Sequence, residues 1–268
     1  SFISLLLSCS YECDCSELDL KAGIFYYEGN PYTGICFEDI GKYHKEKHFL
    51  KGKFNGKYVV WNNKGEKVFE TYYKDGKRDG ITTMWYENGK KYLERTYQKG
   101  EEDGTTIIWY ESGNKKAVEE FQNGKIDGKT KAWYKNGNIK YTKKYDEGIK
   151  HGEWMTWYED GQKKEVQKFK KGTEYGKWIS WYENGKKKKI ANYKDGLHNG
   201  EWMVWHENGK LKEDGFYNHG FEQGQWISYY ENGNKKKVRK FSKGRLNGKL
   251  YEWYDNGQKK NQQEYKDG

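Results

Sequence analysis

The sequence predicts an all-β protein, an elongated single-layer antiparallel meander of about nine 24-residue β-hairpins. Three observations lead to this prediction: a fixed 24-residue period, glycines at set places within each period, and a high content of aromatic residues. The chain has 268 residues, including 33 Gly, 25 Tyr and 12 Trp but one Pro. Aromatic residues favour strands and glycine favours turns, so the composition agrees with the period.

Three series of glycines define the period. The second series runs from Gly76 to Gly268 and the third from Gly80 to Gly248, each in steps of 24 residues. The first series lies in Asn-Gly or Asp-Gly turns, and we predict a structural role for its members, which include Gly89, Gly137, Gly161, Gly185, Gly209 and Gly233. No insertion breaks the register, which indicates that one hairpin follows another without interruption.

The overall composition excludes several classes of protein. Hydrophobic residues make up 34% of the chain, charged residues another 34%, and the mean hydropathy is −1.28. Such values are typical of disordered chains, but disordered chains contain few aromatic residues, and here they reach 18%. A doubly wound enzyme, a helical bundle and a polytopic membrane protein are all disfavoured.

Two kinds of turn alternate along the predicted meander. The Asn-Gly pair is the strongest local signal for a hairpin, and a two-residue type I′ turn would have positive φ at both residues. This turn would place Glu87 opposite Lys90, and likewise Glu183 opposite Lys186 and Glu207 opposite Lys210. The second connection is longer, as in 74–80, and is again marked by glycine.

The aromatic residues form columns with the same 24-residue period. We predict that one tryptophan column is structural; it includes Trp85, Trp109, Trp133, Trp157, Trp181 and Trp205. Equivalent rings would lie about 10 Å apart, two strands away, so other side chains must fill the space between them. Met155, Ile179, Met203 and Ile227, with Val166, Ile190 and Val238, suit that position.

Two further columns are candidate contact residues for a partner. The residue after each structural tryptophan points to the opposite face of the sheet. The candidate binding residues are Tyr86, Tyr110, Tyr134, Tyr158, Tyr182 and Tyr230 together with Trp154, Trp178, Trp202 and Trp226. Tyrosine and tryptophan supply a large contact area at low cost in side-chain entropy. The alternative is that these rings only hold the sheet together.

The start of the chain resembles a processing signal. Residues 1–9 form a short apolar run that ends in Leu6-Leu7-Ser8-Cys9, which is similar to a bacterial lipoprotein signal with Cys9 as the lipidated residue. The resemblance implies export and lipid anchoring at the bacterial cell envelope; a cytoplasmic location is the alternative. We expect residues 10–40 to form an acidic N-terminal cap and residues 41–268 to form the repeat array.

Charge divides along the same boundary. Residues 10–40 carry seven acids and one base, a net charge of −6, whereas residues 41–268 carry 49 bases and 33 acids, a net charge of +16. A basic surface attracts anionic partners, although interspersed Lys and Glu also serve solubility.

The cysteines and histidines give little sign of chemistry. If Cys9 carries lipid, Cys13, Cys15 and Cys36 remain, an odd number that implies no complete disulfide framework. A metal site that combines these cysteines with His44 and His48 is conceivable, but we predict none, and no cofactor. The six histidines occupy varied repeat positions, so we predict no catalytic site and no enzyme activity.

The repeat itself resembles a known family. The pattern Gly-x-Trp-x-x-Trp-Tyr-x-Asn-Gly, followed by an aromatic residue and Lys-Asp-Gly-x-x-x-Gly, is similar to the bacterial variant of the MORN repeat. Such repeats also occur in proteins called the antitoxin component of a toxin–antitoxin module. The resemblance covers 41–268 and implies a sheet that acts as a binding or scaffolding surface, with proteins or anionic lipid head groups as partners.

The function we expect is therefore a non-catalytic repeat scaffold. It would present an aromatic and Lys-rich surface to a protein, or to a glycan or anionic lipid, at the cell surface. Two alternatives remain: an immunity or antitoxin protein that neutralises a toxin, and a cell-wall-binding repeat module. We expect no nucleic acid partner and membrane contact only through an N-terminal lipid anchor.

Overall fold

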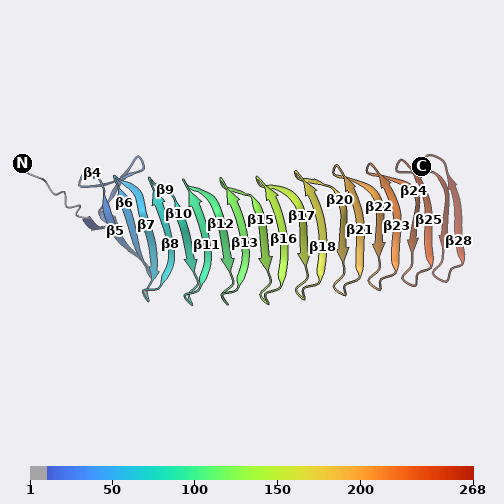
Figure 1. Cartoon of the computed structure of the whole chain (residues 1–268), viewed down its shortest axis with the longest axis horizontal. Coiled ribbons are helices and arrows are strands. Elements are labelled where there is room, and N and C mark those ends of the chain that lie inside the picture. The colour runs from blue at the N-terminus through green and yellow to red at the C-terminus, as the bar shows by residue number, and fades with distance from the viewer. Residues whose placement is uncertain (1–10) are drawn as a thin grey trace, which may run out of the picture. The chain divides into compact units, whose positions relative to one another are not determined.

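The computed structural model describes residues 11–268 of the chain, and the prediction for Cys9 lies outside the described residues. The described chain is all-β apart from one 3₁₀ turn, and consecutive β-hairpins pair in antiparallel fashion (Figure 1). The predicted fold class is confirmed: the chain forms a single-layer meander of hairpin repeats. Two compact units can be distinguished, one up to Ile126 and one from Asp127.

Unit 1 contains the acidic N-terminal segment and the first repeats. Strand β1 pairs with β5 in parallel, β2–β4 form a small antiparallel sheet, and β5 onwards form the meander. Its elements are β1 (Tyr11–Asp14), the 3₁₀ turn η1 (Cys15–Glu17), β2 (Asp19–Lys21), β3 (Ile24–Tyr27), β4 (Asn30–Pro31), β5 (Gly34–Ile40), β6 (Tyr43–Leu50), β7 (Lys53–Asn62), β8 (Lys67–Lys74), β9 (Lys77–Arg78), β10 (Gly80–Trp85), β11 (Lys91–Gln98), β12 (Glu101–Trp109), β13 (Lys115–Gln122) and β14 (Lys125–Ile126).

Unit 2 consists of repeats alone. The long strands pair antiparallel with one another in chain order. The two-residue strands β19 and β26 pair with β18 and β25, which also pair with β20 and β27. Its elements are β15 (Gly128–Trp133), β16 (Ile139–Asp146), β17 (Ile149–Trp157), β18 (Lys163–Lys170), β19 (Thr173–Glu174), β20 (Gly176–Trp181), β21 (Lys187–Lys194), β22 (Leu197–Trp205), β23 (Leu211–Asn218), β24 (Phe221–Tyr229), β25 (Lys235–Ser242), β26 (Arg245–Leu246), β27 (Gly248–Trp253) and β28 (Lys259–Tyr265).

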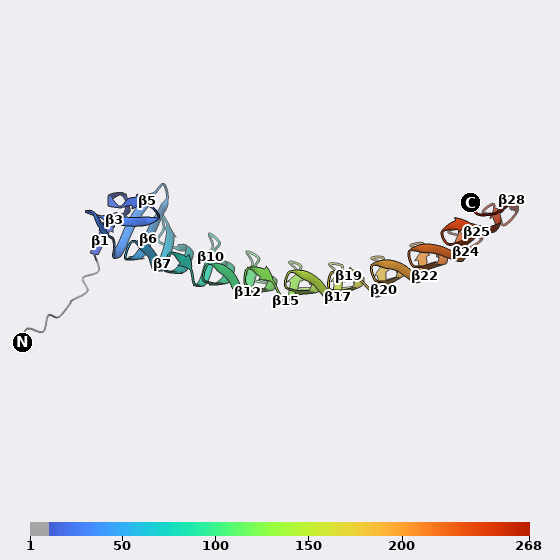
Figure 2. The same ribbon diagram turned by 90° about the horizontal axis from the view of Figure 1, so that it is seen from above.

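Within unit 1, the segment expected to be the cap is joined to the first strands of the expected array, and Figure 2 shows β1, β3 and β5 gathered beside β6. Strand β5 pairs along its whole length with β6, from Gly34 opposite Phe49 to Ile40 opposite Tyr43. The buried side chains of Tyr32, Cys36 and Phe49 form a small core. This core gives the first strands a second layer that a lone hairpin lacks.

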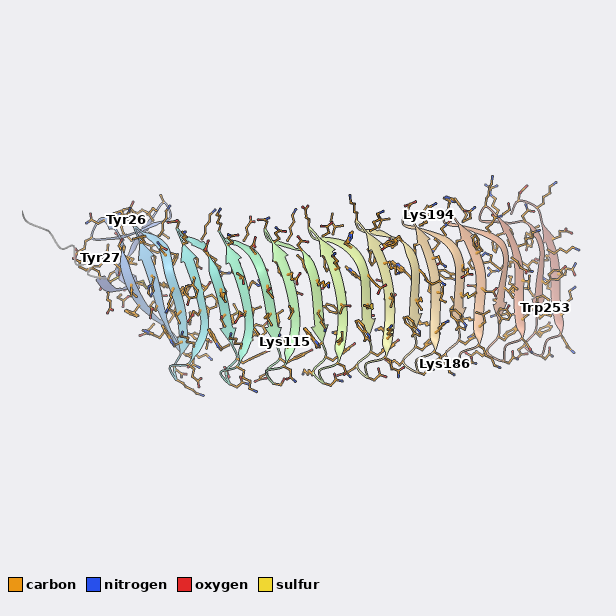
Figure 3. All side chains as sticks on the ribbon, viewed as in Figure 1. Tyr26, Tyr27, Lys115, Lys186, Lys194 and Trp253 are labelled. Atoms are coloured by element: carbon orange, nitrogen blue, oxygen red, sulfur yellow. A yellow bond between two sulfur atoms is a disulfide. The ribbon has the colours of Figure 1, made fainter. Side chains whose placement is uncertain are left out.

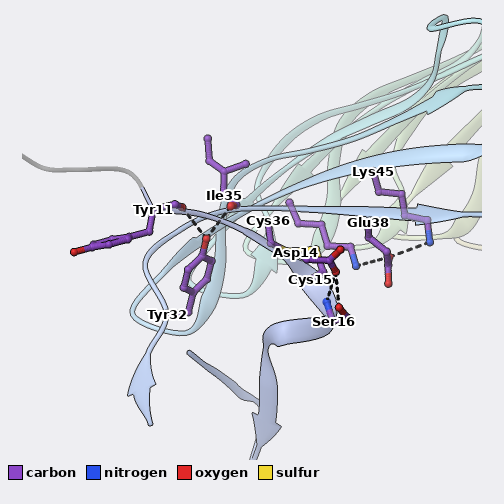
Figure 4. The surroundings of a disulfide bond; sticks show 10 residues. Tyr11, Asp14, Cys15, Ser16, Tyr32, Ile35, Cys36, Glu38 and Lys45 are labelled. Atoms are coloured by element: carbon purple, nitrogen blue, oxygen red, sulfur yellow. Dashed lines mark hydrogen bonds and ion pairs between the residues drawn. A yellow bond between two sulfur atoms is a disulfide. The ribbon is translucent and has the colours of Figure 1, made fainter. Parts of the chain in front are cut away.

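One disulfide closes the N-terminal segment (Figure 4). Cys15 is bonded to Cys36, while Cys13 is a free thiol on the neighbouring β1. The hydroxyl of the buried Tyr32 donates to the carbonyl oxygens of Tyr11 and Ile35, both at 2.7 Å. The disulfide uses two of the thiols that a metal site would have needed.

The Asn-Gly turn differs from the prediction. The Tyr86 N–H donates to the carbonyl oxygen of Lys90 (2.9 Å) and the Gly89 N–H to that of Tyr86 (3.0 Å), so the loop has three residues. Only Gly89, at φ +76°, lies in the left-handed region. This is a type I turn followed by a left-handed residue. The predicted pairing of Glu87 with Lys90 is therefore wrong, because Lys90 lies opposite Tyr86.

The same three-residue loop recurs at the other two predicted Glu–Lys pairs. The N–H groups of Tyr182 and His206 donate to the carbonyl oxygens of Lys186 and Lys210, both at 2.9 Å. Asparagine serves this loop through its side chain, since the Oδ1 of Asn184 accepts from the Lys186 N–H at 3.0 Å. All the predicted structural glycines of this turn have positive φ: Gly89, Gly137, Gly161, Gly185, Gly209 and Gly233.

The type I′ turn occurs instead at the second connection of each repeat. This turn has two residues, so the longer connection predicted for 74–80 is wrong: Lys74 pairs directly with Lys77. Lys171 and Gly172 have φ values of +49° and +82°, and Lys170 pairs directly with Thr173 across them. Both central residues are left-handed, as a two-residue type I′ hairpin requires. The first of the two positions holds Lys, Asp, Asn, Glu or His in different repeats, which hides the turn from simple sequence inspection.

Candidate binding surface

The tyrosine column ties each repeat to the next. The hydroxyl of Tyr158 donates to the backbone carbonyl oxygen of Trp181, 23 residues further on, at 2.8 Å. The same bond is made by Tyr86 to Trp109, Tyr134 to Trp157, Tyr182 to Trp205 and Tyr230 to Trp253, at 2.8–2.9 Å. These tyrosines therefore have a structural task in addition to any contact with a partner, and that contact stays a prediction.

Lysines cover the outer side of the tyrosine rings. The Nζ of Lys164 lies 5.2 Å from the centre of the Tyr158 ring, and the Nζ of Lys188 lies 5.4 Å from that of Tyr182. The same contact recurs at Lys116 with Tyr110, Lys140 with Tyr134, Lys236 with Tyr230 and Lys260 with Tyr254, at 5.4–5.8 Å. These lysines are exposed and lie at the edge of the sheet that carries the three-residue loops, where Figure 3 labels Lys115 and Lys186. Those of unit 2 form a cationic row, which we call the lysine edge: Lys140, Lys164, Lys188, Lys236 and Lys260.

The tryptophan column predicted to be structural is half-buried. Trp157 pairs with Lys163 and Trp181 with Lys187, at a β-bulge that adds one residue after the turn. The other members are Trp85, Trp109, Trp133 and Trp205. The bulge supplies the extra residue, such as Lys164, whose side chain covers the tyrosine.

The second tryptophan set packs into a ladder of rings in unit 2. Trp154 contacts Tyr145 and Phe169, with ring centres 5.0 Å apart in both pairs, and Phe169 contacts Trp178 at 5.3 Å. Further along, Tyr193, His198, Trp202, Tyr217, Trp226 and Phe241 continue the contacts at 4.4–6.3 Å. Rings of the intervening strands fill the space between the tryptophans here.

The aliphatic residues expected as fillers form a row of their own. Met155 pairs with Val166, Val166 with Ile179, and Ile179 with Ile190. Since Met155 directly follows Trp154, this row lies on the face opposite the ring ladder. Each face of the unit 2 sheet thus carries its own apolar row.

Burial decides how much of the ring ladder a partner could reach. Trp154 is 8% exposed and Trp226 2%, while Trp178 and Trp202 are half-buried. The indole N–H groups of Trp154 and Trp178 donate to the carbonyl oxygens of Lys144 and Lys168 at 2.9 and 3.2 Å. Little ring surface of Trp154 and Trp226 remains for contact.

Lysines also lie over the ring ladder. The Nζ of Lys143 is 4.8 Å from the Trp154 ring centre, and that of Lys189 is 4.0 Å from the Trp202 ring centre. Burial lowers the pKa of both amines, and for Lys143 the nearby ammonium of Lys150 lowers it further. Cation–π contact keeps these partly buried lysines in place.

One repeat departs from the pattern at several positions together. Asp214 replaces the aliphatic residue between Met203 and Ile227, and its Oδ1 is buried without a hydrogen-bond partner. Burial raises the pKa of the Asp214 carboxyl, and a hydrogen bond with Tyr229 opposes the rise. Tyr229 in turn stands where the other repeats of the array have tryptophan.

These departures from the repeat pattern are visible in the sequence. The column patterns alone did not place Asp214 opposite Ile227. The signal was available, because Asp214 occupies the repeat position of Ile190 and Val238. The tyrosine-to-backbone bonds were missed because a hydroxyl partner on the main chain leaves no mark in a sequence.

The described residues offer no centre for metal chemistry. Among residues 11–268, no three or more His, Cys, Asp or Glu side chains gather as a metal would require. Within the same range, no helix is of a length and hydrophobicity that would let it cross a bilayer. What recurs instead is surface: the lysine edge, the tyrosine bonds and the ring ladder.

These features define a β-hairpin repeat protein in which the same contacts recur between successive repeats. The chain belongs to the MORN repeat variant family, whose model matches residues 78–99, 126–147, 150–171, 174–195, 199–219, 222–242 and 246–267. These matches cover more than half of the chain and share the 24-residue period. No curated protein matches the sequence.

Proposed function

We propose that the repeat array is a non-catalytic scaffold that binds a protein with an acidic surface through the lysine edge. The observation that carries this proposal is the contact between an exposed lysine and a tyrosine ring, which recurs with the 24-residue period of unit 2 except in the repeat of His206. The ring restricts the lysine side chain, so less entropy is lost when an anionic group binds. Repetition adds avidity for a partner that carries several acidic groups.

The family supports this direction, because MORN repeats are repeat modules that bind proteins or membrane lipids. Anionic lipid or glycan would use the same lysines, and a toxin would be one kind of protein partner. The location that we propose is the bacterial cell envelope, through acylation of Cys9. The support for it is the sequence Leu6-Leu7-Ser8-Cys9.

A capture experiment tests the proposal. The full chain is immobilised, exposed to an extract of its source organism, and compared with a variant in which Lys164, Lys188 and Lys236 are changed to Gln. Each exposed ion pair contributes up to about 0.5 kcal/mol, so three together predict about tenfold weaker binding. Binding should also fade above about 0.3 M salt, where screening is strong.

The control variant removes the same charge elsewhere. Lys177, Lys240 and Lys249 are exposed and pair near the opposite ends of the strands. Changing these three to Gln should weaken binding less than twofold. Equal loss in both variants would reduce the effect to net charge, and retention of anionic vesicles without any protein would favour a lipid partner; either result contradicts the proposal.

A further inference from the structure

The tyrosine column is interrupted once in unit 2, at His206. The imidazole Nε2 of His206 lies 3.0 Å from the carbonyl oxygen of Tyr229, the bond that Tyr158 and Tyr182 make in their repeats. The tie between repeats is therefore kept, but an imidazole ring is smaller than a phenol ring. The side chain of His206 is 14% exposed, so it forms a wall rather than a free group.

A cavity of about 360 Å³ lies beside this ring. Its lining includes Val204, His206, Ser228 and Tyr230. Val204 and Ser228 belong to the cross-strand row in which Glu213 pairs with both of them. The volume falls within the range of small-molecule sites, about 300–1,000 Å³.

Lys212 lines the cavity without the ring contact that its equivalents make. In the other repeats of unit 2, the lysine six residues after the tyrosine covers the tyrosine ring, as Lys188 covers Tyr182. Lys212 has that position relative to His206 and lines the cavity, yet it has no ring contact or ion pair with any of residues 11–268. An ammonium group that lines a cavity can make a cation–π contact with an aromatic ring bound there.

We propose that this hollow binds one aromatic side chain of a protein partner, with the ring beneath Lys212 and against Tyr230. The inference rests on the proposed function and deepens it. The two lysines of the lining, Lys212 and Lys236, are balanced by Glu213 and Glu231, which favours an uncharged ring over an anion. Within unit 2, histidine replaces tyrosine in this column in one repeat alone, so a hollow built on His206 selects one register among several for the partner.

The probe is p-cresol, the side-chain analogue of tyrosine, titrated into the full chain and followed by two-dimensional amide NMR. We expect saturable shifts centred on Val204, Lys212 and Ser228. 4-Methylcyclohexanol, which has a similar size but no π system, should bind more weakly. Changing Lys212 to Gln should weaken p-cresol binding about two- to fivefold.

Four further variants fill the hollow or test whether a second one can be created. His206→Tyr and His206→Phe both replace the small ring and should abolish the shifts. Tyr182→His should create a second site one repeat earlier, around Ser180 and Lys188. Tyr182→Phe, which loses the hydroxyl but keeps the ring, should not.

The result that overturns the inference is the absence of saturable p-cresol shifts around His206, or shifts that persist unchanged in both filling variants. The outcome is independent of the capture experiment. A chain that binds p-cresol but captures no protein would contradict the proposed function alone. Conversely, a captured protein whose affinity is unchanged by His206→Tyr and His206→Phe would contradict the inference alone.

Discussion

At the residue scale, Gly215 has a specific role, because it lies against the ring ladder. A Cβ atom placed on Gly215 would lie 2.2 Å from Cδ2 of Trp226, so the indole ring rests directly on the glycine backbone. Gly215 belongs to none of the three periodic glycine series, and its φ lies outside the left-handed region. Glycine is needed here because it leaves room for the Trp226 ring, not because of its conformational freedom.

Changing Gly215 to Ala should therefore destabilise the protein through steric overlap alone. We expect a loss of about 2 kcal/mol or more, since the ring of Trp226 is buried and cannot move without opening the ladder. The measurement is urea unfolding followed by tryptophan fluorescence. The control is Gly233→Ala, where φ is +96° and the nearest atom is the flexible Cδ of Lys210; strain alone should cost about 1 kcal/mol. A smaller effect at Gly215 than at Gly233 would contradict the packing.

Asp214 predicts a dependence of stability on pH. Its pKa is raised by burial above its ordinary value of 3.8, so the folded protein takes up a proton before the unfolded chain does. The penalty of the charged carboxylate is present at neutral pH and is relieved as the pH falls toward 3.8. Asp214→Val, which restores the residue type of Val238, should gain about 1–3 kcal/mol at pH 7.

The contribution of Asp214 is isolated by comparing free energies of unfolding at pH 7 and at about pH 4, close to the ordinary pKa of the carboxyl. The gain from Asp214→Val should shrink at the lower pH. A gain that stays constant between the two pH values would mean that the carboxyl is not the source of the penalty.

At the element scale, the two turns of a hairpin repeat demand different conformations. In the two-residue turn, Lys171 adopts φ +49°, which is unfavourable for a residue with a Cβ atom. In the three-residue turn, Lys135 precedes Asn136 and Gly137, and only the glycine is left-handed. Placing a single glycine in each turn therefore distinguishes them.

Lys171→Gly should stabilise the protein by about 0.5–1 kcal/mol, because glycine adopts the left-handed region without strain. Lys135→Gly should destabilise it instead, since a glycine there only adds freedom to the unfolded chain. Thermal unfolding of the two single variants gives both signs. Equal shifts in the same direction would show that the turn types are assigned wrongly.

The fold followed from the sequence to a large extent, whereas the contacts at the candidate site did not. The glycine period and the alternation of aromatic residues predicted hairpins and their length, because turns and pleat leave local patterns. The pairing of Glu87 with Lys90 was predicted wrongly, because an asparagine side chain that accepts a backbone N–H makes the longer loop equally compatible with Asn-Gly. The lysine over each tyrosine depends on a bulge such as that at Trp157, which the sequence pattern does not show.

At the scale of the whole molecule, the proposed scaffold requires that the 24-residue period of the sequence is also the period of the structure. In unit 2, the same cross-strand pair recurs with a spacing of 15 residues in every hairpin. These pairs are Lys129 with Lys144, Glu153 with Lys168, Lys177 with Asn192, Glu201 with Phe216, Gln225 with Lys240 and Lys249 with Glu264. A partner that binds one repeat would meet the same backbone geometry in the next, which is the physical basis of the proposed scaffold.

Cysteine cross-linking of these pairs is the most direct test of that claim. Directly opposite residues of antiparallel strands have Cα atoms about 4.5–5.5 Å apart, which lies within the Cα separations of about 4.4–6.8 Å found in disulfides. Each pair is replaced by two cysteines, oxidised, and mapped by mass spectrometry, beside a control in which the second cysteine is moved one residue back. We predict efficient cross-links in all six hairpins and poor ones in every control. Cross-links in only some hairpins, or equal yields in the shifted controls, would contradict the 24-residue hairpin array.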